Sequence, residues 1–169
     1  ANSFPPGIRK GFAPSINPKV NSVGSYRTHF YLPDDWISGE IILRFGGVKS
    51  AFYLWINGNY VGYSQGSMLP AEFNISDYVN RGRSLLARQV YRCPDGTYLE
   101  DQDMWFLAGI FRDVTLLYLN RIHIWDYSFA SKFDDDYQDA TVDIRAKIHG
   151  TSDVIQECSL MVFLKRLSD

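Results

Sequence analysis

Apolar and polar residues alternate with a period of two through much of the first 119 residues, a pattern typical of β-strands with one buried face. In the first such segment Tyr26, Phe30 and Leu32 share one face, while Arg27 and His29 share the other. The strands predicted in this part of the chain span residues 26–32, 41–45, 51–56, 59–63, 85–91 and 114–119.

Turn residues separate these segments and decide the fold class. Asn57-Gly58 lies between two apolar and aromatic runs, which predicts a hairpin with a type I′ turn because both residues tolerate positive φ. Only residues 75–79 have a helical pattern, which predicts a single turn ended by Gly82. Short strands between turn clusters predict an all-β sandwich.

The pattern changes near residues 119–121, and this change predicts a domain boundary. Beyond it, residues 122–129, 141–148 and 158–164 alternate cleanly and predict three more strands. The acidic run at 134–136 is interpreted as a solvated loop between two of them. Three strands form only half of a sandwich. We therefore expect one domain over residues 1–119 and part of a second over 120–169.

Charge and composition exclude several classes of partner. Lys and Arg total 17 against 19 Asp and Glu, a net charge of -2, so no basic surface for nucleic acid is expected. No apolar run reaches the roughly 18–20 residues of a membrane span, and the start lacks a secretory leader. These features predict a cytoplasmic protein with no membrane partner. Cys93 and Cys158 are expected to be free, buried thiols.

Carboxylates and aromatic residues gather most densely in residues 95–105. Glu100, Asp101 and Asp103 lie within four residues, next to Trp105. Such a group can bind sugar hydroxyls or a hard cation, with an aromatic ring covering a sugar face; alternatively, the acids are solvated or cap the local backbone. A glycosidase pair stands about 5–9.5 Å apart on rigid elements, so self-contained catalysis by this loop is not expected.

Other catalytic patterns are missing from the sequence. His29, His123 and His149 have no nucleophile or metal-ligand spacing near them and are interpreted as structural. Residues 62–66 superficially match a nucleophile elbow, but no helix is predicted after them. Aromatic residues make up 15% of the chain, and their simplest role is to fill the core of the sandwich.

Long ordered motifs resemble the N-terminal jelly-roll domain, often called sugar-binding, of glycoside hydrolase family 2 β-galactosidases. The motifs that carry the resemblance occupy residues 24–27, 30–33, 47–58, 61–67, 69–73, 95–105 and 109–114. The resemblance implies a jelly-roll over 1–119, expected to lack its first strands, and the start of an immunoglobulin-like sandwich from residue 120. In the family, a TIM barrel then supplies two catalytic Glu residues and the magnesium ligands, and none of that barrel is present in this sequence.

The resemblance also implies a role for single residues. Asp103 matches the family's aspartate that reaches the active site, binds galactose hydroxyls and helps to ligate sodium. Asn2 matches a second sugar contact less closely, because its spacing is one residue short. Glu100, Asp101 and Trp105 are expected to support the loop.

These matches predict a non-catalytic segment of a retaining β-galactosidase that is inactive alone. Its expected partners are a β-galactoside and the other domains of a homo-oligomeric parent enzyme. The sequence leaves two alternatives open: a stand-alone carbohydrate-binding module, and a structural piece that complements a split enzyme. It also departs from the family at 19–23, an apparent insertion, and at Cys93-Pro94, where Trp-Ser is common.

Overall fold

The computed structural model describes residues 16, 21–36, 38–100, 107–150 and 159–165. The chain divides into two compact units, Ala1–Tyr118 and Leu119–Asp169, and each is considered by itself below. In the described residues, nearly all regular structure is antiparallel β-strand, which confirms the predicted all-β class.

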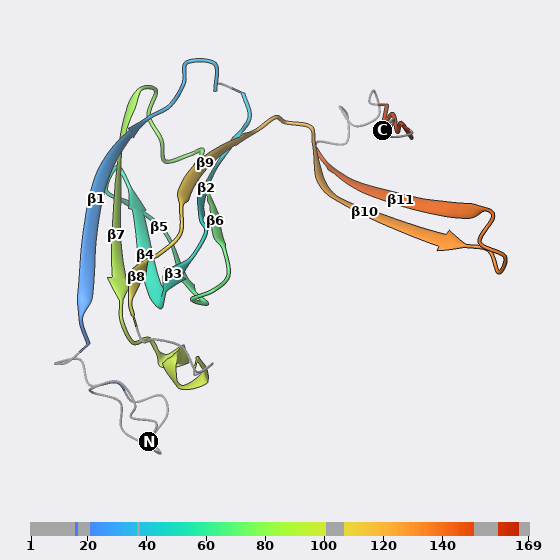
Figure 1. The fold of residues 1–169 in the computed structure, drawn as a ribbon. Coiled ribbons are helices and arrows are strands. Elements are labelled where there is room, and N and C mark those ends of the chain that lie inside the picture. Colours follow the sequence, from blue (N-terminus) through green and yellow to red (C-terminus); the bar gives the residue numbers. More distant parts are fainter. Residues whose placement is uncertain (1–15, 17–20, 37, 101–106, 151–158, 166–169) are drawn as a thin grey trace. The chain divides into compact units, whose positions relative to one another are not determined.

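The larger sheet of the first unit has four strands in the order β1-β7-β4-β5 (Figure 1). Its strands are β1 (Val23–Tyr31), β4 (Ala51–Ile56), β5 (Asn59–Gln65) and β7 (Arg83–Tyr91). The alternation predicts all four strands. β4 matches its predicted range, β5 and β7 extend beyond theirs at one end, and β1 begins earlier and ends one residue earlier than predicted. Asn57 and Gly58 join β4 to β5 with φ of 50° and 84°, as the type I′ prediction requires.

A three-stranded sheet in the order β6-β2-β9 forms the second layer, and a short pair, β3-β8, lies beside it. Their bounds are β2 (Glu40–Phe45), β3 (Val48–Lys49), β6 (Ala71–Asn74), β8 (Gly109–Ile110) and β9 (Val114–Leu119). The alternation predicts β2 and β9 but not the shorter β3, β6 and β8. Strands of two to four residues carry too little periodicity to be detected from sequence.

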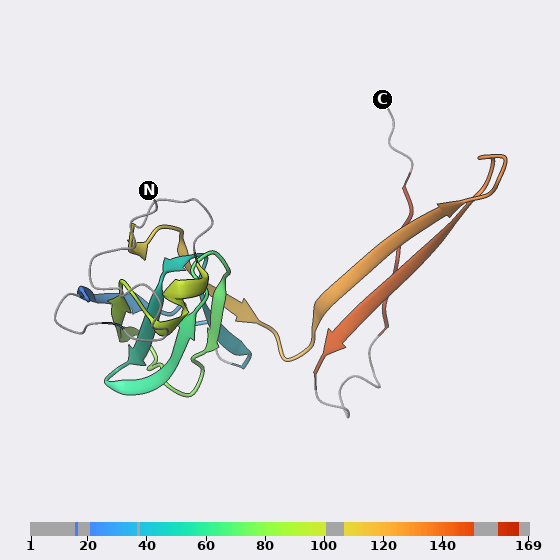
Figure 2. The same ribbon diagram turned by 90° about the horizontal axis from the view of Figure 1, so that it is seen from below.

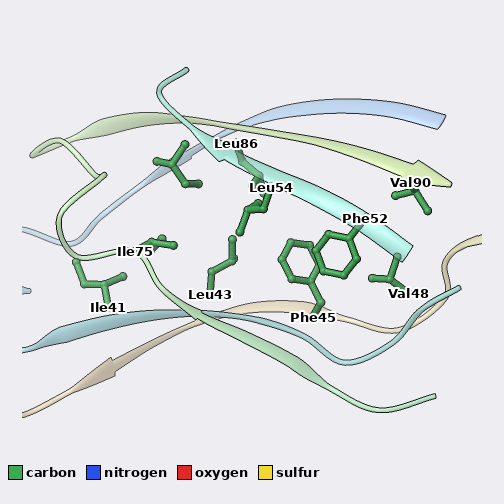
Figure 3. Close-up of a cluster of buried hydrophobic side chains, with 10 residues drawn as sticks. Ile41, Leu43, Phe45, Val48, Phe52, Leu54, Ile75, Leu86 and Val90 are labelled. Carbon is green, nitrogen blue, oxygen red and sulfur yellow. The ribbon is translucent and has the colours of Figure 1, made fainter. Parts of the chain in front are cut away.

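The core fills the space between these two sheets (Figure 3). Phe45 of β2 and Phe52 of β4 meet at the centre, with ring centroids 4.7 Å apart. Leu43, Leu54 and the other buried apolar residues extend this contact along both sheets. Alternate residues of β4 point inward, so Phe52, Leu54 and Ile56 are buried while Tyr53 is exposed.

One local prediction needs correction, and one short helix was not predicted. Residues 75–79 form a hydrogen-bonded turn, with Tyr78 N donating to Ile75 O, rather than a helical turn. Ile75 is fully buried against the core. The apolar residue at this position therefore reflects a core contact and not one face of a helix. The described helix is instead a 3-10 turn, η1 (Asp95–Leu99), where no helical periodicity is visible.

The second unit contains a long hairpin of β10 (His123–Phe133) and β11 (Ala140–His149), whose strands run side by side in Figures 1 and 2. The acidic run lies in the exposed turn between them, where Asp134 accepts backbone hydrogen bonds from Gln138 and Asp139. The third predicted strand is wrong for residues 159–164, which have no strand structure. Alternation of apolar and polar residues is not sufficient for a strand, because a strand also needs backbone hydrogen bonds to a neighbouring strand. Residues 159–164 pair with none of the described strands.

Candidate functional site

The acidic segment singled out in the sequence begins where β7 ends. Asn21 fixes the chain there through two hydrogen bonds with the backbone of Cys93: its side-chain N–H donates to Cys93 O (2.9 Å), and Cys93 N donates to its Oδ1 (3.0 Å). Cys93 is buried. Burial raises the pKa of its thiol, which outweighs the lowering by the positive charge of Arg92. From Cys93 the chain continues directly into η1, the yellow-green coil after β7 in Figure 1.

Glu100 follows η1 and is tied to a turn that lies 33 residues earlier in the sequence. Its carboxylate accepts two hydrogen bonds from Ser67, one from the backbone N–H (3.1 Å) and one from the hydroxyl (2.5 Å). Ser67 is only 2% exposed, and Gly66 and Leu69 close the turn around it. A charged acceptor bonded to a buried donor pair makes a strong local anchor.

The other end of the loop is held to the same turn. Arg112 donates from one guanidinium nitrogen to the carbonyls of Met68 (2.9 Å) and Gly46 (3.2 Å). β3 pairs with β8 in the register Lys49↔Gly109. Consecutive residues of one turn, Ser67 and Met68, therefore anchor both flanks of the segment 101–106.

A small cavity of about 10 Å³ separates the two flanks. Its lining includes Lys49 and Cys93 from the sandwich and Thr97, Glu100 and Leu107 from the flanks. Lys49 and Thr97 are both buried, and Thr97 Oγ1 has no hydrogen-bond partner among the described residues. The volume is close to that of one water molecule, so the two flanks approach each other closely at this point.

Four of the five residues predicted to form the site lie outside the described residues: Asn2, Asp101, Asp103 and Trp105. Glu100 is the one that the structure places, and its carboxylate binds the turn at Ser67. Local sequence patterns do not reveal the contributions of Ser67 and Arg112, because each acts through contacts tens of residues away in the chain.

The histidines occupy strand positions in the described structure. His123 and His149 face each other across β10 and β11, with their rings stacked 5.2 Å apart, and His29 Nδ1 lies 3.2 Å from an Arg83 nitrogen. Within the described part of the chain, no group of three or more His, Cys, Asp or Glu residues could hold a metal ion. None of the described helices is long and apolar enough to cross a membrane.

Comparison with known proteins agrees with this architecture. The profile of the family described as "Glycosyl hydrolases family 2, sugar binding domain" matches residues 5–120. The chain is 49% identical over 135 residues to a β-galactosidase of Pectobacterium atrosepticum and 43% identical over 154 residues to one of Priestia megaterium. These alignments cover 79% and 88% of the chain but only 13% and 15% of the relatives' lengths.

Solved structures of glycosidases also resemble this chain, at lower sequence identity. A β-glycosidase from Bacteroides vulgatus has a TM-score of 0.62 at 25% identity and is matched over 77% of this chain and 16% of its own. A Bacteroides uniformis β-glucuronidase has a TM-score of 0.65 at 26% identity, over 75% of this chain and 16% of its own. The profile match and these likenesses show that the chain belongs to glycosyl hydrolase family 2, of which it contains the sugar binding domain.

Proposed function

We propose that this chain is the non-catalytic sugar-binding segment of a β-galactosidase and that it presents Asp103 to the sugar. In this proposal the glycosidic bond is cleaved by a catalytic domain elsewhere in the parent polypeptide. The chain spans 13–15% of the curated relatives that it matches, which leaves room in a parent of that size for such a domain.

The observation that carries the proposal is the double anchoring of the loop that contains Asp103. Glu100 before it and Arg112 after it both bind the turn at Ser67 and Met68. A side chain that contacts substrate must be held within a fraction of an ångström to be effective. The chain is therefore held at both ends of the eleven residues that separate Glu100 from Arg112, which supports a role in substrate positioning.

A galactoside is favoured over a glucuronide by sequence likeness. Curated relatives named β-galactosidase are 43–51% identical to the chain, whereas the solved β-glucuronidases and β-glycosidase are 22–26% identical. Galactose is neutral and offers hydroxyl donors, which a carboxylate such as that of Asp103 accepts. A glucuronide carries its own carboxylate, which the same group would repel.

The proposal includes a sodium ion that Asp103 helps to ligate. Hard cations take carboxylate oxygens, so the donor type fits. The remaining ligands, and the magnesium site of the parent, would belong to its catalytic domain.

Asp103→Asn in the full-length protein that carries this segment tests the proposal. Asparagine keeps the size of the side chain but loses its charge, so we expect kcat/KM for a β-galactoside to fall by about 10²-fold or more, with the Tm unchanged. Asp77→Asn, in an exposed turn, is the matched control and should behave as wild type. Unchanged kinetics for Asp103→Asn, or a reading frame that encodes no catalytic domain, would refute the proposal.

A further inference from the structure

A groove of about 420 Å³ lies on the outer face of the four-stranded sheet, beside the start of η1. Tyrosines from three adjacent strands line it: Tyr63 of β5, Tyr53 of β4 and Tyr91 of β7. Its volume falls in the range of roughly 300–1,000 Å³ in which small-molecule sites occur. The function proposed above does not use this groove.

The strand register brings the tyrosine rings together. Tyr53 and Tyr63 are direct cross-strand partners with centroids 4.8 Å apart, and Tyr91 lies edge-on to Tyr53 at 5.7 Å. The outward-facing Trp55 and Tyr60 continue the cluster. Tyr53 is 37% and Tyr63 40% exposed. Both rings are therefore accessible on this face of the sheet.

Polar groups border the rings at the end near η1. Exposed Asp95 lines the groove. Burial raises the pKa of Tyr63, and the negative charge of Asp95 raises it further. The Tyr63 hydroxyl donates to Gln65 Oε1 (2.9 Å), so its oxygen can still accept a hydrogen bond. Ring faces beside a carboxylate and a hydroxyl form a surface that is apolar in the middle and polar at its edge.

We infer that this groove binds a neutral hexopyranose, with the C–H face of the sugar on the Tyr53 ring and sugar hydroxyls donating to Asp95. Pyranose rings have one apolar face and a rim of hydroxyls, which matches that arrangement.

A quaternary ammonium, the other ligand class that aromatic residues and an acid can bind, fits the groove poorly. A cage for such a cation needs ring faces that stand on opposite sides of it. The Tyr53 and Tyr63 rings instead touch each other at 4.8 Å, with an angle of 46° between their planes, and leave no gap between them.

Titration of the 1–169 chain with methyl β-D-galactopyranoside, followed by NMR of labelled tyrosine rings, tests the inference. We expect saturable shifts of the Tyr53 and Tyr63 signals, with a dissociation constant on the order of 1–10 mM. Tyr53→Ala should weaken binding about tenfold or more. Asp95→Asn keeps the side-chain size, so it tests the groove even if Tyr53→Ala does not fold. This variant should weaken sugar binding by about three- to tenfold. Tyr31→Ala, at an exposed tyrosine of β1 that does not line the groove, is the control.

The inference fails if these ring signals do not move at about 50 mM sugar, a concentration well above the expected dissociation constant. It also fails if tetramethylammonium produces the shifts and the sugar does not. If Asp103→Asn abolishes binding while Asp95→Asn and Tyr53→Ala leave it intact, the sugar binds at the loop and the groove is not a site. Because the groove and the loop are probed by different variants, failure here leaves the proposal for Asp103 in place.

Discussion

Glu100→Ala removes the acceptor of both hydrogen bonds from Ser67 and leaves that residue's N–H and hydroxyl without a partner. Ser67 is only 2% exposed, so water replaces the lost acceptor poorly. A hydrogen bond to a charged group contributes about 1.5–3 kcal/mol, and an unsatisfied buried donor costs about 1–3 kcal/mol. Glu100 itself is half-buried, so we take the low end and expect a loss of about 2 kcal/mol for the variant.

A loss of about 2 kcal/mol lowers the Tm of a domain of this size by roughly 8 °C. Urea denaturation of the chain measures the free energy of unfolding directly. Hydrogen exchange gives a local readout, because the Ser67 amide should exchange faster in Glu100→Ala than in the wild type. Ser67→Ala loses only the hydroxyl bond and should cost about 1 kcal/mol.

Glu100→Gln is the conservative control. Its amide oxygen can accept from the Ser67 N–H while its amide nitrogen donates to the Ser67 oxygen, so both contacts survive without the charge. We expect a loss of less than about 1 kcal/mol for this variant. Equal stability of Glu100→Ala and wild type, together with unchanged protection of the Ser67 amide, would show that the anchor does not hold the loop.

Two further predictions concern ionisable groups. Burial raises the pKa of the Cys93 thiol, so in a Cys158→Ser chain this thiol should react with a disulfide reagent at neutral pH at least about tenfold more slowly than a free cysteine, a difference that denaturant abolishes. Burial, and secondarily Asp95, raises the pKa of Tyr63, so its stabilising contribution is present below the unfolded value near 10 and is lost as pH rises through the folded value. Asp95→Asn should lower the pKa of Tyr63, measured by ring NMR, without removing the whole shift. An unchanged pKa would show that the charge of Asp95 does not act on Tyr63.

Local sequence patterns predicted the sandwich well because they depend on the chain itself. The side-chain period of two sets which residues of β4 point inward, whatever β4 pairs with. Asn57-Gly58 accepts positive φ at both positions, so the hairpin turn follows from two residues. The same logic failed at residues 159–164, where an alternating pattern has no strand beside it among the described residues.

The sites depended on contacts that no local pattern encodes. The acidic segment was visible as a motif, but its anchor joins Glu100 to Ser67 across 33 residues and Arg112 to Met68 across 44. The tyrosine groove requires β5, β4 and β7 to lie in that order and in one register. A shift by one residue would turn Tyr63 to the opposite face.

The sequence by itself determined the fold class, the inward and outward positions of each long strand, and the residues of the candidate loop. Tertiary structure alone decided which turn holds that loop and which rings share a surface. The physical reason is that periodicity fixes the direction of each side chain along its own strand. Neighbours across strands are fixed only when pairing and core packing, centred here on Phe45 and Phe52, select one register for the two sheets.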